Sequence, residues 1–361
     1  AKKLIAPAGP ADGSRITLSL PLARIQKAEG TAVITNTGKD IVAGDSRFAF
    51  EAEKIALVRD GDGDDVLARI PAHTHDGITY TPVYSLAEIP SNATGGYYLL
   101  QDSKMSGTVT VGANNTVNIC LNGHKSEPIY FKNNGTLNIT DCKHDTATPG
   151  YITGYSSNFG GNNIETTSGS TLNLTNVTVK EKTGSTFISA TGATVNISGC
   201  EYYDSESGFL VASTGSKVTV TDSTFKNNTM RAPTLWFTAE GATTGSFTVK
   251  DCTFTGNANN TQNVNYETSR GCAINSGCPG TTLIEKCIIT ENLSHGDGGG
   301  IYLYGKGTAT IKNTTVEDNE SQWHGGGIAV DSANAPVFTG TVVVKNNKSR
   351  IPYNAYYQDM T

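Results

Sequence analysis

The sequence has few charged residues, and its basic side chains are outnumbered. Charged residues make up 17% of the 361-residue chain, and 27 Lys and Arg stand against 33 Asp and Glu, which gives a net charge of −6. Soluble domains usually carry about 25% charged residues. A nucleic-acid-binding protein needs a basic surface to neutralise phosphates, so the composition argues against that class.

Long apolar runs are also missing. Hydrophobic residues make up 37% of the chain, but no segment approaches the ~20 consecutive apolar residues of a membrane-spanning helix. We therefore expect a folded core and no membrane insertion. The chain carries no anchor or sorting motif before Thr361, so we expect it to be part of a larger surface protein.

Asparagine and cysteine are almost absent from the first part of the chain. Only two asparagines precede residue 100, and all seven cysteines lie at or after Cys120. This change in composition predicts a small all-β domain over residues 1–80, a proline-containing linker over 81–94 and a second domain over 95–361. Alternating apolar residues, as in residues 16–20, predict half-buried strands that pack as a small β-sandwich.

One short phrase recurs through the second domain. Apolar residues generally occupy its first and third positions, and a small residue or Cys often occupies its sixth. Phrases repeated every 20–35 residues, with no helical pattern between them, are typical of a parallel β-helix. We predict about nine coils, because nine copies begin at Val117, Leu137, Leu172, Val195, Val218, Phe247, Thr282, Ala309 and Val342.

Asparagines recur five residues after the sixth position of the phrase. In a solenoid, equivalent residues stack about 4.8 Å apart, so these side chains are predicted to form a hydrogen-bonded amide ladder. Apolar residues three positions earlier are predicted to stack inside the coil. The ladder residues are Asn228, Asn257, Asn292 and Asn319, and the apolar residues are Phe225, Phe254, Ile289 and Val316.

Four cysteines share the sixth position of the phrase. They are predicted to form a column of small, buried, reduced thiols. Cys272 and Cys278, six residues apart, are the best-placed pair for a disulfide. The cysteines of the column are Cys142, Cys200, Cys252 and Cys287.

Two local motifs resemble known β-helix families. The Phe-x-x-Asn motif at Phe225 and Phe254, with the Gly-Gly-Ile motif ending at Ile301 and Ile328, resembles the repeats of polymorphic outer-membrane proteins and related right-handed β-helix adhesins. Residues 95–124 resemble the first coil of β-helix proteins on the surface of Gram-positive gut bacteria. The resemblance implies a right-handed β-helix, an extracellular or cell-surface location, and adhesion to a glycan or host surface protein.

Enzymatic activity is the main alternative, because pectate lyases and polygalacturonases share this architecture. Asp222 and Asp251 precede the sixth position in neighbouring coils, and Lys286 follows in the same column. A polysaccharide lyase or glycoside hydrolase needs such clustered acidic and basic groups. The other interpretation is that Asp is favoured at turns, where it hydrogen-bonds local backbone. A phage or viral spike is a third hypothesis.

A second group of candidate residues lies near the glycine-rich motifs. His295 and His324 each precede a glycine and are 29 residues apart, close to one repeat. We predict that they are neighbours in a patch that contacts a sugar or a metal. Asp297, Tyr302 and Trp323 complete this predicted patch, since exposed aromatic faces stack on sugar rings.

Two segments before residue 80 carry residues that bind metals. Asp60, Asp62 and Asp64 are either part of a solvated hairpin turn or oxygen ligands for Ca²⁺. His73 and His75 would lie on one face of an extended segment, where they could hold Zn²⁺ or Ni²⁺ weakly. The sequence reveals no third ligand and no Cys-x-x-Cys pair, so a polar linker is the simpler interpretation, and no other cofactor is expected.

Overall fold

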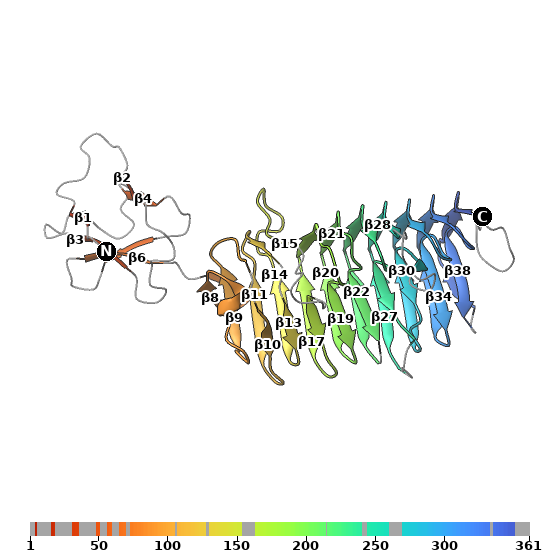
Figure 1. The fold of residues 1–361 in the computed structure, drawn as a ribbon, viewed down its shortest axis with the longest axis horizontal. Coiled ribbons are helices and arrows are strands. Elements are labelled where there is room, and N and C mark those ends of the chain that lie inside the picture. Colours follow the sequence, from red (N-terminus) through yellow and green to blue (C-terminus); the bar gives the residue numbers. More distant parts are fainter. Residues whose placement is uncertain are drawn as a thin grey trace. The chain divides into compact units, whose positions relative to one another are not determined.

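The computed structural model describes residues 73–361, except 105–106, 128–129, 154–162, 214, 240–243, 260–268, 333–334 and 351–361, and the backbone of six strands within residues 1–72 (Figure 1). These six strands form a four-stranded sheet, ordered β1-β3-β6-β5, and a two-stranded sheet of β2 and β4. They are β1 (Leu4–Ile5), β2 (Ile16–Leu18), β3 (Thr31–Thr35), β4 (Phe48–Phe50), β5 (Ala56–Arg59) and β6 (Asp65–Arg69).

An antiparallel hairpin of β7 (His73–His75) and β8 (Ile78–Val83) follows. Its two-residue turn, Asp76 and Gly77, has φ of +52° and +74°, as a type I′ turn requires. The chain divides into two compact units, residues 1–84 and 85–361. The hairpin is the last element of the first unit, and β9 (Gly95–Leu99) is the first strand of the second.

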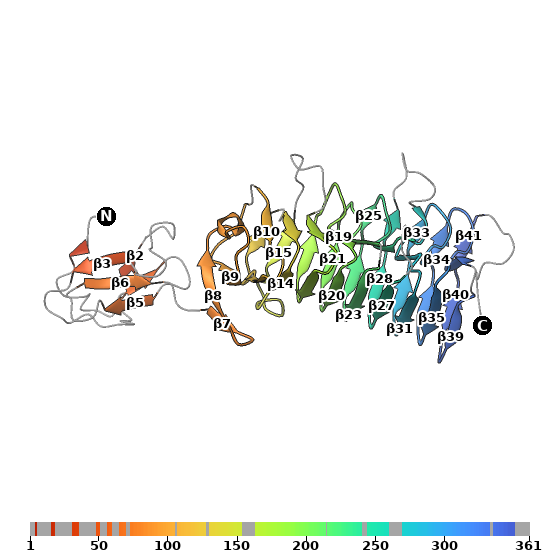
Figure 2. The ribbon, with the colours of Figure 1, turned by 90° about the horizontal axis from the view of Figure 1, so that it is seen from below.

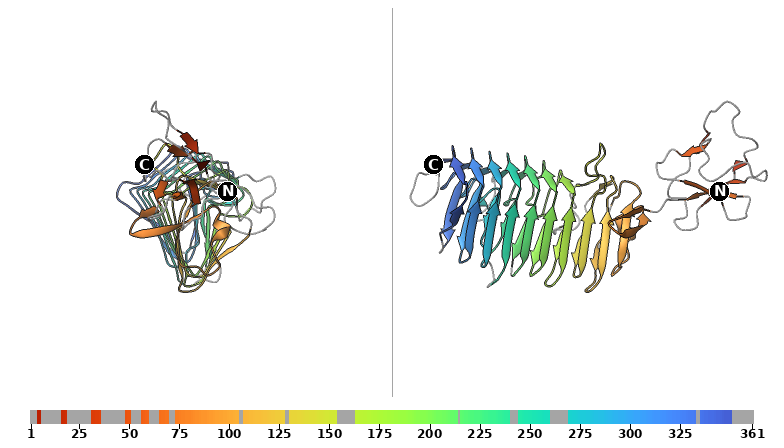
Figure 3. Two further views of the ribbon diagram at one scale, coloured as in Figure 1. Left: turned by 90° about the vertical axis from the view of Figure 1, so that its left-hand side faces the viewer. Right: turned by 180° about the vertical axis from the view of Figure 1, so that it is seen from behind.

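The rest of the described chain is a right-handed parallel β-helix, which confirms the predicted fold class (Figures 1 and 2). Each coil between the first and the last contributes one strand to each of three long sheets, and the end-on view in Figure 3 shows the coils superimposed. The 3-10 helix η2 (Leu86–Glu88) precedes β9, and its Leu86 is buried. Among the described residues, no helix is long and apolar enough to cross a membrane.

Within the second unit, the first sheet has ten strands from β9 to β39, and the second sheet has nine. After β9, the first contains β11 (Thr116–Cys120), β14 (Thr136–Thr140), β17 (Thr171–Thr175), β20 (Thr194–Ser198), β23 (Lys217–Thr221), β27 (Ser246–Lys250), β31 (Thr281–Glu285), β35 (Thr308–Lys312) and β39 (Val337–Thr339). The second contains β12 (Lys125–Ser126), β15 (Tyr151–Thr153), β18 (Thr178–Lys180), β21 (Glu201–Tyr203), β24 (Thr224–Lys226), β28 (Thr253–Thr255), β32 (Ile288–Thr290), β36 (Thr315–Glu317) and β40 (Val343–Lys345).

The third sheet also has nine strands, and a short five-stranded sheet precedes it in the later coils. The third contains β10 (Val109–Val111), β13 (Phe131–Asn133), β16 (Ile164–Thr166), β19 (Ile188–Thr191), β22 (Leu210–Ser213), β26 (Leu235–Phe237), β30 (Ile274–Ser276), β34 (Ile301–Gly305) and β38 (Ile328–Ser332). The short sheet contains β25 (Thr229–Met230), β29 (Ala258–Asn259), β33 (Leu293–Ser294), β37 (Glu320–Ser321) and β41 (Lys348–Ser349).

The recurring phrase corresponds to the strands of the first sheet. Eight copies lie on β11 to β35 with their apolar residues in register, as where Leu172 pairs with Val195. The ninth predicted copy, at Val342, is wrong: it falls on β40, which pairs with β36 of the second sheet. The next strand of the first sheet is β39. The error arises because both strands have only three residues and begin with two apolar ones, Val-Phe in β39 and Val-Val in β40.

The corners before and after each second-sheet strand are formed by residues with positive φ. The first corner is occupied by Asn176, Gly199, Asp222, Asp251, Lys286 and Asn313, and the second by Glu181, Asp204, Asn227, Gly256, Glu291, Asp318 and Asn346. Gly, Asn and Asp adopt this left-handed conformation most readily. The two corner columns therefore account for much of the recurring Asn, Asp and Gly.

The predicted asparagines lie directly after the second corner and form a buried ladder. The Nδ2 atom of Asn228 donates to Oδ1 of Asn257 at 2.8 Å, and Asn257 donates in turn to Asn292 at 2.9 Å. Asn292 continues to Asn319 at 2.9 Å, and Asn319 to Asn347 at 3.0 Å. The buried rings of Phe225 and Phe254 stack inside with centroids 4.7 Å apart, followed by buried Ile289 and Val316.

A second amide ladder, not predicted from the sequence, lies on the partly exposed face of the first sheet. Asn138 donates to Asn118 at 2.6 Å, Asn173 to Asn138 at 2.6 Å, and Asn196 to Asn173 at 2.8 Å. These residues occupy the position between the two apolar residues of the phrase. Water reaches this ladder, whereas it does not reach the one behind the second corner.

The predicted cysteine column is buried at Cys200, Cys252 and Cys287, but the prediction is wrong for Cys142, which is exposed. After Cys200 the next strand begins at once, so the thiol points inward, where burial raises its pKa to about 12. After Cys142 the chain runs through residues 143–150 before β15 begins, which leaves the corner open. All seven cysteines are described, and none is in a disulfide, including the pair predicted at Cys272 and Cys278.

Candidate functional site

Three charged or polar side chains stand in one column before the third sheet. Arg270, Asp297 and His324 are 27 residues apart, and the strands that follow them, β30, β34 and β38, pair in register. Each is followed by a glycine with positive φ, +63° at Gly271, +72° at Gly298 and +60° at Gly325. The glycine turn repeats the same geometry in each coil and stacks the three side chains.

The tight packing of these turns explains the runs of glycine. At Gly299, an added Cβ atom would lie 1.9 Å from the carbonyl oxygen of Gly326 in the next coil. No side chain fits at that distance. The backbones of successive coils therefore come close enough for Asp297 to reach both of its neighbours.

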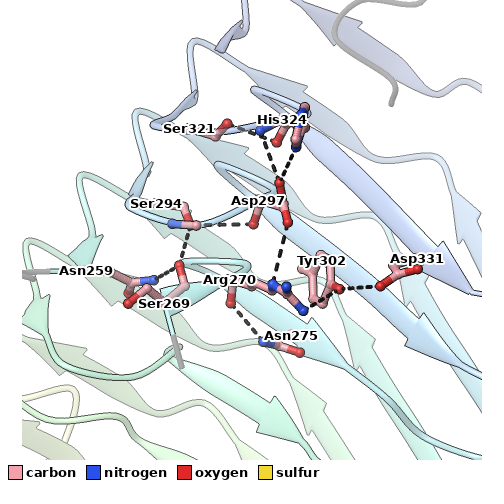
Figure 4. A network of polar contacts seen from close by, with 11 residues as sticks. Asn259, Ser269, Arg270, Asn275, Ser294, Asp297, Tyr302, Ser321, His324 and Asp331 are labelled. Carbon is pink, nitrogen blue, oxygen red and sulfur yellow. Dashed lines mark hydrogen bonds and ion pairs between the residues drawn. The ribbon is translucent and has the colours of Figure 1, made fainter. Parts of the chain in front are cut away.

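Asp297 is the centre of the column (Figure 4). Its side chain is 5% exposed, and its Oδ1 lies 2.8 Å from Nδ1 of His324 and accepts the backbone N–H of His324 at 3.1 Å. Its Oδ2 lies 3.5 Å from Nε of Arg270. One buried carboxylate thus pairs with the coil before it and the coil after it, as a buried charge requires.

Tyr302 extends this network along the outer face of the third sheet. Its hydroxyl accepts a hydrogen bond from Nη1 of Arg270 at 2.9 Å and donates to Oδ2 of Asp331 at 3.2 Å. Burial raises the pKa of Tyr302, the Arg270 charge opposes this shift and Asp331 reinforces it. The hydroxyl therefore remains protonated at neutral pH and acts as a hydrogen-bond donor.

Backbone contacts hold the network in place (Figure 4). Nδ2 of Asn275 donates to the carbonyl oxygen of Arg270 at 2.8 Å, and Oγ of Ser321 donates to that of His324 at 2.9 Å. Nδ2 of Asn259 and Oγ of Ser294 both donate to the carbonyl oxygen of Ser269. The charged side chains are thus fixed by the coil turns on which they stand.

The structure brings Asp297, His324 and Tyr302 together, with the ring of Trp323 6.3 Å from that of His324 and 42% exposed. The coils here repeat every 27 residues, so Asp297 and not His295 holds the position equivalent to His324. Burial lowers the pKa of His295, and the nearby positive charge of Arg350 adds to this effect.

The sequence analysis missed Arg270 and Asp331 as members of this network. The 27-residue spacing from Arg270 to Asp297 to His324 was a usable signal. Asp331 carried no such signal, because it reaches Tyr302 diagonally across neighbouring strands.

The acidic column proposed for catalysis lies at the first corner. Asp222, Asp251 and Lys286 are exposed and have φ of +50°, +53° and +53°, and Lys250 lies 3.9 Å from Asp251. The backbone conformation by itself explains Asp at two of these positions. Asp60, Asp62 and Asp64, the candidate calcium ligands, lie outside the described residues.

A substitution at Asp222 tests the backbone explanation. We expect Asp222→Gly to keep the melting temperature of the parent, because Gly adopts positive φ without strain, and Asp222→Val to cost about 1–2 kcal/mol. Thermal unfolding followed by circular dichroism measures both. Polysaccharide turnover by the parent that is lost in Asp222→Gly would instead support the catalytic hypothesis.

The stacked coils and their parallel sheets define a right-handed parallel β-helix, which carries the column around Asp297 at the turns before its third sheet. The family model described as "Right handed beta helix region" matches residues 88–356, so the chain belongs to this family. Among solved structures, an alginate lyase from Paenibacillus sp. str. FPU-7 is similar, with 12% identity over 67% of this chain and 99% of that chain and a TM-score of 0.28. No match was found among curated proteins.

Proposed function

We propose that this chain is an extracellular recognition module that binds a glycan, on a cell surface or a host glycoprotein, through the site around Asp297. The observation that carries this proposal is Trp323, an aromatic ring 42% exposed next to the fixed polar groups of His324 and Asp297. Aromatic faces stack on sugar rings, while a few oriented polar groups bind hydroxyl groups and provide specificity.

The resemblance to adhesins of the polymorphic outer-membrane type and of Gram-positive gut bacteria supports the finer proposal of adhesion. A stack of coils held by two amide ladders is a stiff support for such a site. Equivalent side chains in neighbouring coils lie about 4.8 Å apart, close to the length of one sugar unit. A glycan chain that runs along the coils would therefore meet a new coil at each residue.

Polysaccharide cleavage is the second candidate, and one contact favours it. His324 is oriented by a buried carboxylate at 2.8 Å, as a general base is oriented in many enzymes. In a lyase reaction a ring nitrogen of His324 would take a proton from a ring carbon of the sugar, a carbon–carbon double bond would form in the ring as the bond to the leaving oxygen breaks, and the leaving oxygen would take a proton from water. A lyase of this kind also needs clustered carboxylates that bind Ca²⁺, and Asp222 and Asp251 are the acidic candidates in the sequence.

Replacing Trp323 with Ala tests the binding proposal. We expect glycan affinity to fall at least tenfold, because the stacking surface is lost, while the melting temperature stays unchanged, since the ring is exposed. A glycan array identifies the ligand, and calorimetry on the best hit gives the affinity. Equal affinity of the parent and Trp323→Ala would exclude this face.

The same samples separate binding from cleavage. Turnover is followed by the ultraviolet absorbance of unsaturated products and by new reducing ends, with and without Ca²⁺. Product formed by the parent and lost in His324→Gln would establish the enzyme. Saturable binding without product would support the recognition module.

A further inference from the structure

Two cysteines from neighbouring coils come together near the beginning of the β-helix. Cys120 is the last residue of β11, and Cys142 follows β14, the strand that pairs with β11. Their Sγ atoms lie within 4.8 Å of each other, and the side chain of Cys142 is exposed. We propose that Cys120 and Cys142 are oxidised to a disulfide that joins these two coils.

The two residues already contact each other as thiols. The thiol of Cys142 raises the pKa of Cys120 by hydrogen bonding, and the backbone N–H of Cys142 opposes part of this shift. The sulfur of Cys120 therefore lies against both the thiol and the backbone of Cys142. The sulfur atoms of a disulfide are about 2.05 Å apart, so rotation of the two side chains closes the remaining gap without a movement of the coils.

Hydrogen bonds fix the corner on which Cys142 stands. The preceding residue, Asp141, has a buried carboxylate that accepts the backbone N–H groups of Gly123 at 2.8 Å and Gly150 at 2.6 Å. Gly123 follows Cys120 by three residues, so this carboxylate ties the two coils together beside the sulfur atoms. Closing the disulfide therefore restricts little backbone that is not already fixed.

A second pair of neighbouring cysteines lacks the exposure of Cys142. Cys252 and Cys287 share the sixth position of consecutive copies of the phrase, and Cys287 raises the pKa of Cys252 by hydrogen bonding. Both residues are only 1% exposed, so an oxidant in solution does not reach either sulfur in the folded chain. Thiol–disulfide exchange requires an accessible attacking thiol. Cys142 meets this requirement, and the pair at Cys252 and Cys287 does not.

The reaction is a thiol–disulfide exchange with glutathione disulfide as the oxidant. The Cys142 thiolate attacks one glutathione sulfur, forms a mixed disulfide and releases one glutathione thiolate. Cys120 then gives its proton to water, its sulfur attacks Sγ of Cys142, and a second glutathione thiolate leaves. Two protein thiols are oxidised, and one glutathione disulfide is reduced to two thiols. The mixed disulfide also removes the Cys142 thiol that raised the pKa of Cys120, which favours the second step.

The experiment uses the full chain, purified under reducing conditions and then equilibrated in the folded state with oxidised and reduced glutathione. We expect it to lose two of its seven free thiols. Trypsin cleaves after Lys125 and Lys132, so the two cysteines lie on separate peptides, which mass spectrometry should detect as one linked species until a reductant is added. The melting temperature should rise by about 5 °C on oxidation, because the bond cross-links neighbouring coils.

Matched variants separate this disulfide from general thiol oxidation. Cys142→Ser should form no linked peptide and should melt at the same temperature with and without glutathione, whereas Cys252→Ser should still form the linked peptide. The proposal is overturned if the parent keeps all seven thiols free, if the linked peptides carry other cysteines, or if Cys142 retains a bound glutathione. None of these readouts involves glycan binding, so the result is independent of the proposed function.

Discussion

Replacing Asn292 with Ala is expected to lower the melting temperature of the β-helix by about 10 °C. Its amide donates to Asn319 and to the carbonyl oxygen of Phe254, and it accepts both the side-chain and the backbone N–H of Asn257. The substitution leaves several buried groups short of a hydrogen bond, at about 1–3 kcal/mol each when no water replaces it. A loss near 4 kcal/mol corresponds to that shift for a domain of this size.

Asn173→Ala is the matched control for this prediction. Asn173 also lies inside an amide ladder, between Asn138 and Asn196, but on a partly exposed face of the first sheet. Water can replace the lost hydrogen bonds there, so the melting temperature should fall by only about 2–3 °C. Equal shifts in the two variants, measured by differential scanning calorimetry, would show that burial does not govern the strength of these ladders.

Removing the carboxylate of Asp297 is expected to cost about 3–5 kcal/mol and to abolish ligand binding. In Asp297→Ala, the half-buried Arg270 guanidinium loses its buried counter-charge, and the ring and backbone N–H of His324 lose their acceptor. Breaking a buried pair by deletion of one partner is strongly destabilising, because the other charge remains desolvated. Urea unfolding followed by circular dichroism measures the loss.

Two further variants separate charge from structure. Asp297→Asn keeps the size of the side chain and removes its charge, so it should recover part of the stability but not the orientation of the His324 ring. Glu317→Ala removes a more exposed ion pair, with 2.9 Å between Glu317 and Lys345, and should unfold close to the parent. If Asp297→Ala and Glu317→Ala unfold at the same urea concentration, the column is not a coupled network.

Most of the β-helix can be predicted from the sequence, because a solenoid repeats its structure at nearly equal intervals. The phrase that begins at Leu172 and Val195 predicts strands β17 and β20 and their pairing, and the ladder at Asn228 and Asn257 predicts which residues stack. Spacing does not identify the sheet to which a short apolar strand belongs. The phrase at Val342 is an example, since both β39 and β40 begin with two apolar residues and lie in different sheets.

The candidate sites depend on contacts that spacing does not contain. The network around Asp297 combines a stacked column with a diagonal contact from Tyr302 to Asp331, and only the column repeats along the chain. No local motif describes such a diagonal pair, because sheet pairing rather than chain proximity brings Tyr302 and Asp331 together.

The 27-residue spacing of Ile274, Ile301 and Ile328 has an evolutionary consequence. Coils of equal length can be duplicated or deleted by recombination without disturbing the hydrophobic stack, so the rod can change length in whole steps. The charged column makes these steps unequal in their effect. Loss of the coil that carries Asp297 would place Arg270 beside His324, and both would lose the carboxylate that now lies between them. Selection on the site would thus preserve this coil while other coils are duplicated or deleted.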